Sequence, residues 1–117
     1  MGLREVMGDT ALVMSAAAAG TYVSGPIASP GLANDVQLLV HVSAFTGTPT
    51  LNVSLEESTD NATWTALTGS AIAQIGAATG SANANARPTK SYVRVTATVA
   101  GTTPTVSFRA LVLIIPG

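Results

Sequence analysis

The chain has 117 residues, a length that suits a single domain, and only 9% of them are charged, against about 25% in typical globular proteins. Five lysines and arginines and six acidic residues are scattered along it, giving a net charge of -1, which excludes the basic surface that nucleic-acid binding requires. The absence of cysteine excludes disulfides, thiolate chemistry and cysteine-ligated metal sites.

The low fraction of charged residues bears on what the surface of the protein contacts. An isolated soluble domain usually carries mixed charges, whereas this chain must rely on threonine, serine, asparagine and glycine for its polar exterior. A surface covered by neighbouring subunits tolerates weak charge, because its contacts can use apolar and hydroxyl side chains. We therefore predict a protein that packs against other protein copies; the alternative is a neutral, threonine-rich monomer.

The N-terminal part is predicted to be an extended arm over residues 1–20, followed by a single β-sandwich domain over residues 21–117. Short strands are expected at Asp9–Ser15 and Thr21–Ser24. The glycines, prolines and asparagine of Ser24–Asp35 indicate a loop.

The apolar run Ala11–Gly20 is similar to the core of a secretory signal, but its flanks are not. Glu5 and Asp9 offset Arg4 where a signal needs net positive charge. At about ten residues the run is also shorter than the roughly 20 needed to span a bilayer. We expect an unprocessed protein made in the cytosol, with no membrane partner.

Four segments alternate apolar and polar residues with the period of two that is typical of half-buried antiparallel strands. They are Val36–Ala44, Leu51–Glu57, Tyr92–Val99 and Thr105–Ile115. The final third of the last segment is apolar on both faces, as in a strand that is covered from two sides. No segment has strong helical periodicity.

The connections between these strands have the same arrangement twice. Gly47–Thr50 joins the first two strands and Gly101–Thr105 joins the last two, and each carries a proline beside the opening of the next strand. Proline suits the first residue of a strand because it lacks an N–H donor. We therefore predict two equivalent hairpins, one in each sheet of a sandwich.

The middle of the chain holds the candidate ligand loop. Asp60 and Asn61 have side chains that suit an Asx-type turn, and Trp64 is expected to fill the space between the sheets. Gly69–Pro88 is dominated by glycine, alanine, serine and asparagine, and we predict that it is mostly loop. A ligand or glycan site in this region would use Trp64, Asp60 and Asn61.

Catalytic candidates are few. His41 is the single histidine, and its neighbours on the same strand face include no carboxylate to orient it. Glu56 and Glu57 point to opposite faces of their strand, so they cannot act as an acid and base pair. Glu57 with Asp60 offers oxygen ligands for a hard cation, but the spacing matches no EF-hand loop. We predict no catalytic residue, no cofactor, no metal ligand and no enzymatic activity.

Apolar side chains near the two ends of the chain are the candidate interface residues, since exposed strand edges and the apolar end of the last strand could pair with other chains. They are Leu111, Leu113 and Ile115 in the C-terminal strand and Leu12, Val13 and Met14 in the N-terminal arm.

Three motifs carry a resemblance to a known family. They are V-x-V-S-A-x-x-G-T-P-T-L-x-V (Val40–Val53), E-S-x-D-x-x-x-W (Glu57–Trp64) and Y-V-R-V-x-x-x-V-x-G-T-x-P-T (Tyr92–Thr105). With the apolar C-terminal strand, they make the stretch from Leu38 to Ile115 resemble the small β-sandwich structural proteins of tailed bacteriophages, of the capsid decoration or cement kind. The resemblance implies assembly as trimers or at symmetry positions of the head, and no catalytic residues.

The expected fold is all-β, an antiparallel β-sandwich of Ig-like or jelly-roll type with about seven or eight strands and an extended N-terminal arm. The expected protein is a virion component made in the bacterial host cytoplasm. It would bind the major capsid protein or other virion proteins, form a homo-oligomer with a trimer favoured, and stabilise the outside of the head by multivalent contacts. A minor tail, neck or fibre-base protein is one alternative, and a carbohydrate- or cell-surface-binding module is the other.

Overall fold

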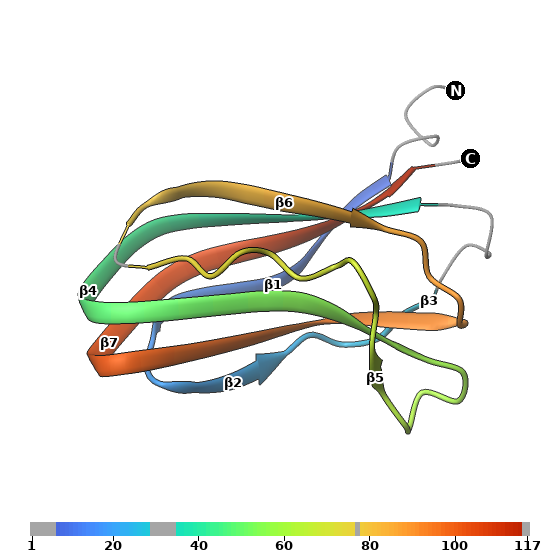
Figure 1. Ribbon diagram of the computed structural model, residues 1–117, viewed down its shortest axis with the longest axis horizontal. Helices are drawn as coiled ribbons and strands as arrows, with labels where there is room; N and C mark the ends of the chain where they lie inside the picture. Colours follow the sequence, from blue (N-terminus) through green and yellow to red (C-terminus); the bar gives the residue numbers. More distant parts are fainter. Residues whose placement is uncertain (1–6, 29–34, 77, 116–117) are drawn as a thin grey trace.

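The computed structural model describes residues 7–28, 35–76 and 78–115, and within them every regular element is a strand. The strands are β1 (Met7–Ala17), β2 (Gly20–Val23), β3 (Ile27–Ala28), β4 (Asp35–Ser58), β5 (Thr65–Ala66), β6 (Gly80–Ala86) and β7 (Tyr92–Ile115) (Figure 1). All pairings are antiparallel. The predicted all-β, antiparallel class is confirmed. Over the same residues, no helix is long and apolar enough to cross a membrane.

The frame of the molecule is a ribbon of two strands, β4 and β7, of 24 residues each. They pair along their whole length, from Asp35 opposite Ile115 to Ser58 opposite Tyr92. Both strands bend sharply at the same end of the molecule, so that the ribbon folds back over itself (Figure 1). Register shifts near this bend mark the bulges that let a continuous ladder turn the corner.

The two predicted hairpins are wrong. Gly47–Thr50 and Gly101–Thr105 are the bends within β4 and β7, so the segments on either side belong to one strand, and each strand pairs with the other. The reason is close backbone contact at the corner: a Cβ atom on Gly47, whose φ is 72°, would lie 2.5 Å from the Thr103 carbonyl oxygen. Glycine permits this approach and this torsion.

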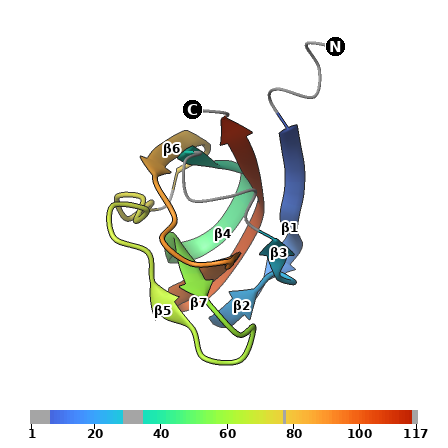
Figure 2. The same ribbon diagram turned by 90° about the vertical axis from the view of Figure 1, so that its right-hand side faces the viewer.

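The folded ribbon gives the two layers of a sandwich (Figure 2). The first layer has the order β1–β7–β4–β6 and uses the N-terminal half of β4 and the C-terminal half of β7. The second layer uses the other halves, with β2 and β3 beside β7 and β5 beside β4. The predicted alternation holds within each half, because the apolar rows of β4 and β7 face each other across the core: Val36, Leu38, Val40, Val42, Leu51, Val53, Leu55, Val93, Val95, Ala97, Val99, Val106, Phe108, Ala110 and Val112.

Strand β6 lies within Gly69–Pro88; apart from β6 and an isolated bridge at Ile75, the described residues of this range belong to no strand, in line with the prediction that it is mostly loop. The seven residues of β6 have low strand propensity, yet they pair with Val36–Val42 of β4. Small alanines alternate with polar residues, and the alanines pack against the core. Tertiary pairing with an adjacent apolar strand therefore decides the conformation here.

Most of the N-terminal segment that the structure describes is strand. The predicted strand at Asp9–Ser15 lies within β1, which pairs with β7, and β2 accounts for most of the predicted strand at Thr21–Ser24. In the predicted loop Ser24–Asp35, Ile27 and Ala28 form β3, and residues 29–34 lie outside the described part. The division into an arm and a domain at residue 20 stays a prediction.

Candidate interaction surface

The outer face of the first layer is built from rows of side chains that cross all or most of its four strands. One row joins Ser81 of β6, His41 of β4, Arg109 of β7 and Val13 of β1. The next joins Asn83, Leu39 and Leu111, and a third joins Asn85, Gln37 and Leu113. The apolar and basic members of these rows, termed the outer patch, are Val13, Leu39, His41, Arg109, Leu111 and Leu113.

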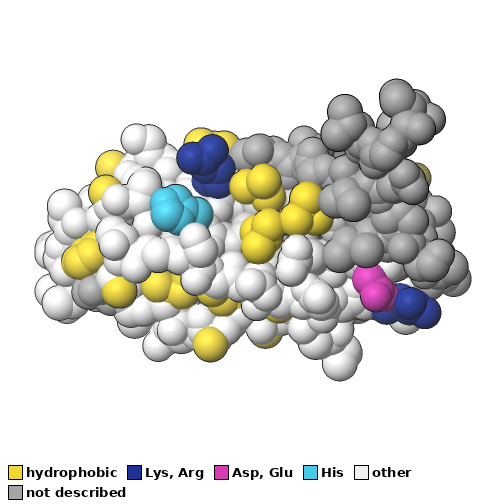
Figure 3. All heavy atoms as spheres, turned by 90° about the horizontal axis from the view of Figure 1, so that it is seen from above, with side chains coloured by type: hydrophobic (Ala, Val, Ile, Leu, Met, Phe, Trp, Pro, Cys, Tyr) yellow, Lys and Arg dark blue, Asp and Glu magenta, His cyan; other side chains and the backbone are white. Residues whose placement is uncertain are grey.

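Apolar side chains gather on this face beside the arginine and the histidine (Figure 3). Val13 is 66% exposed, and Leu39, Leu111 and Leu113 are half-buried. A sheet face that meets water is ordinarily polar, so these leucines depart from the expected alternation.

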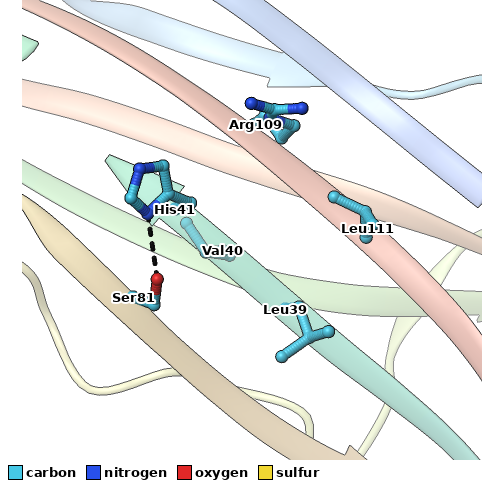
Figure 4. Close-up of a pocket in the computed structure, with 6 residues that line it drawn as sticks. All are labelled: Leu39, Val40, His41, Ser81, Arg109 and Leu111. Atoms are coloured by element: carbon cyan, nitrogen blue, oxygen red, sulfur yellow. Dashed lines mark hydrogen bonds between the residues drawn. The ribbon is translucent and has the colours of Figure 1, made fainter. Parts of the chain in front are cut away.

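A shallow pocket of about 240 Å³ lies within the outer patch. Leu39 and Leu111 are register partners and line one part of it, while His41 and Arg109, also partners, line the other (Figure 4). A hydrogen bond of 2.9 Å joins His41 Nδ1 and Ser81 Oγ and orients the ring. The pocket therefore offers an apolar area with a cationic guanidinium at its margin.

The predicted interface residues divide between this face and the interior. Leu111 and Leu113 lie on the outer face of β7, and Val13 lies on that of β1. Leu12 and Met14, on either side of Val13, pack against the core. Ile115 ends β7, and its side chain lies outside the described residues.

Sequence reasoning missed Leu39, His41 and Arg109 as members of one surface. The sequence did contain a signal for Leu39, because this leucine lies on a strand face whose other residues are Gln37, His41 and Ser43. No sequence signal joins that row to Arg109, since the two strands pair only after the ribbon has formed.

The outer face of the second layer differs from that of the first because its central rows carry hydroxyl and amide side chains. Asn52 and Ser54 of β4 lie opposite Thr98 and Thr96 of β7, and Thr21 of β2 continues the first of these rows. Its hydroxyl is 3.4 Å from that of Thr98. The outer patch thus lies on one of the two layers, and the second layer exposes a separate valine, Val23 of β2.

The predicted Asx-type turn is present at Asp60. Its Oδ1 atom accepts hydrogen bonds from the backbone N–H groups of Ala62 and Thr63 and from the Ser58 hydroxyl, each at 2.9 Å. The bonds from Thr63, Ala62 and Ser58, in that order, lower the pKa of Asp60 to about 2. These contacts give the carboxylate a structural role in closing the turn.

Trp64 does not fill the space between the sheets as predicted. It is half-buried on the outer face of the second layer, where the Arg94 guanidinium lies 4.4 Å from the centre of its ring. Arg94 Nε also donates to Glu56 Oε1 at 2.8 Å. Phe108 is the large aromatic side chain of the core instead, because β7 directs its alternate residues inward. Trp64 therefore takes part in a surface cation–π contact.

The Glu57 carboxylate also forms hydrogen bonds within the chain, with different partners from those of Asp60. It is buried and accepts hydrogen bonds from the N–H and the hydroxyl of Thr89, at 2.8 and 2.9 Å. Among the described side chains, no group of three or more His, Cys, Asp and Glu residues gathers where it could hold a metal ion.

Comparison with known proteins bears on the fold. No family model matches the chain, and no curated protein matches it. Among solved structures, the crystal structure of the PBSX exported protein XepA superposes with a TM-score of 0.68 at 16% identity, over 95% of this chain and 37% of that one. The chain thus spans little more than a third of the length of its neighbour, and at this identity the likeness shows a shared fold.

Proposed function

We propose that this chain is a structural protein of a phage particle, that it decorates the outside of the capsid, and that it catalyses no reaction. The fold likeness to an exported protein of the phage PBSX supports the phage assignment. A fold by itself serves many functions, so the specific role depends on the surface.

The outer patch is the observation that carries the proposal. Its leucines and Val13 form an apolar area on a sheet face that no other described part of the chain covers. Contiguous apolar patches on soluble domains mark sites of protein interaction. A sheet face with an apolar area beside a histidine and an arginine suits the surface of another folded protein better than a small polar substrate.

The arrangement of charges supports the same role. Asp35 pairs with Arg87 at 2.9 Å and Glu56 pairs with Arg94 at 2.8 Å, so these four side chains neutralise one another within the subunit. Arg109 is the cationic member of the outer patch, so attachment there would combine apolar contact with the charge of one guanidinium. Weak single contacts become firm attachment when one assembly engages many sites at once.

Particles that lack the protein provide the test. Deleting the gene should lower the temperature at which heated particles release their genome, and adding the purified protein back should restore it. Val13→Gln should bind the depleted particles less well because it places an amide in the apolar patch. Val23→Gln is the matched control, since Val23 is also an exposed valine on an edge strand but lies on the second layer.

The outcomes separate the decoration role from its rivals. Unchanged heat stability in particles proven to lack the protein would refute the cement role. Copy number distinguishes a head protein, present at many sites, from a minor tail, neck or fibre-base protein, present in few copies.

A second candidate function, a carbohydrate- or cell-surface-binding module, is favoured by one observation: Trp64 lies at the surface rather than in the core. Aromatic rings on a protein surface provide apolar contact area for ligands. Glycan-array binding that is lost in Trp64→Ala, with the fold intact, would support this function over capsid decoration.

A further inference from the structure

Strand β6 is an edge of the first layer. It pairs with Val36–Val42 of β4 over seven consecutive positions without a bulge. On its other side the described chain places no strand (Figure 2). No backbone hydrogen bond from the described turns and loops reaches residues 80–86. Among the described residues, the strand therefore presents a row of N–H and C=O groups without backbone partners, with Gly69 beside the Asn85 carbonyl at one end of the row.

The remaining edge strands of the described sheet carry features that limit pairing, and β6 does not. Strand β1 is interrupted by two register shifts, and Ala16 within it has a φ of 51°. Strands β2, β3 and β5 are only two to four residues long. Short strands, bulges, charges and prolines are the usual means of protecting an edge. Residues 80–86, Gly-Ser-Ala-Asn-Ala-Asn-Ala, contain none of these.

A second copy of the same chain fits this edge. When β6 pairs antiparallel with β6 of a second copy, neither chain keeps an unpaired β6 edge, so the assembly closes at two chains. Pairing of β6 with any other edge would leave the β6 edge of the next copy unpaired, and further copies could add to it. Asn83, the central residue, would lie opposite itself, and Ser81 opposite Asn85. These uncharged side chains avoid like-charge repulsion and can bond across the strands.

We propose that β6 joins two copies of this chain into a two-fold dimer with one continuous sheet of eight strands, four from each first layer. This inference goes beyond the proposed function and does not depend on what the outer patch binds. In such a dimer the two outer patches lie on the same face of the sheet, because each copy contributes its β6–β4–β7–β1 layer in the same plane. The dimer therefore presents two binding patches together.

Single introduced cysteines test the pairing directly, because the natural chain has none. Asn83→Cys should give a covalent dimer on oxidation, since residue 83 faces itself across the axis at a separation that a disulfide can bridge. Asn52→Cys is the control, as Asn52 is an exposed asparagine on the second layer. Ser81→Cys and Asn85→Cys should cross-link efficiently with each other when mixed, and each far less with itself.

The mass of the unmodified protein supplies a second measurement. Sedimentation should give a dimer of two 11.7 kDa chains. Asn83→Lys places like charges face to face and should weaken dimerisation by about tenfold or more, whereas Asn52→Lys should not. A monomer at high concentration would overturn the proposal. So would a folded Asn83→Cys protein that does not cross-link, or a trimer in which residue 83 is no more reactive than residue 52.

Discussion

Gly101 lies directly against the backbone of Thr48, at the corner where β4 and β7 bend together. A Cβ atom on Gly101 would overlap the Thr48 carbonyl oxygen, and Gly47 on the other strand faces the Thr103 carbonyl in the same way. The two glycines let the strands turn the corner while remaining paired. One ribbon can therefore supply the centre of both layers, and the outer patch depends on this arrangement.

Replacing Gly101 by alanine should destabilise the protein. The residue has a φ of 125° and no room for a Cβ atom, so we expect Gly101→Ala to lower the free energy of unfolding by about 2 kcal/mol or more. Denaturant titration measures this. Gly25→Ala is the control, because an added Cβ there meets nothing within 4 Å. Equal stability of the two variants would show that the corner tolerates a side chain.

Ser70 should stabilise the second layer through its hydroxyl. Ser70 is buried, and its Oγ atom accepts from the Leu55 N–H at 2.9 Å and donates to the Leu67 carbonyl at 2.7 Å. Ser70→Ala leaves a buried donor of β4 unpaired and should cost about 1–3 kcal/mol of unfolding free energy. The exposed Ser81→Ala should cost about 0.5 kcal/mol or less in the same assay. A smaller loss for Ser70 than for Ser81 would contradict this role.

Trp64 and Phe108 should differ in their contribution to stability. Because Trp64 lies at the surface over Arg94, we expect Trp64→Ala to cost about 1 kcal/mol. Phe108 is 2% exposed, so Phe108→Ala should cost about 3–5 kcal/mol. Thermal and denaturant unfolding compare the two variants. A larger loss for Trp64 than for Phe108 would restore the interpretation that Trp64 lies in the core.

The charge of Asp60 should make the turn sensitive to acid. Its pKa is about 2 in the folded protein, below the ordinary value of 3.8, so the ionised form is favoured by folding. Its stabilising effect is therefore fully present above pH 3.8 and is lost as the pH falls towards 2. Asp60→Asn, which keeps an acceptor oxygen but no charge, should be less stable than the natural protein at pH 7.

The measurement is the difference in unfolding free energy between the two proteins as a function of pH. It should shrink as the pH falls from 3.8 towards 2 and approach a constant below that range. A difference that does not change with pH would show that the charge of Asp60 contributes nothing to the turn.

The sequence by itself determined the class of the fold and the inward face of the long strands. Alternation at Val36–Val42 and at Val93–Val99 reflects which side chains meet the core, and this period of two survives any choice of pairing. The turn at Asp60 was also predictable from the sequence, because an aspartate side chain accepts hydrogen bonds from backbone N–H groups two and three residues further along the chain.

Only the tertiary structure decided which strands are neighbours. The bends at Gly47 and Gly101 have the composition of hairpin turns, and they became corners because each glycine meets the backbone of the other strand, more than 50 residues away in sequence. The same long-range pairing made β6 a strand and brought Leu39 beside Leu111. Local sequence cannot encode these contacts, since their free energy arises only when distant segments are brought together.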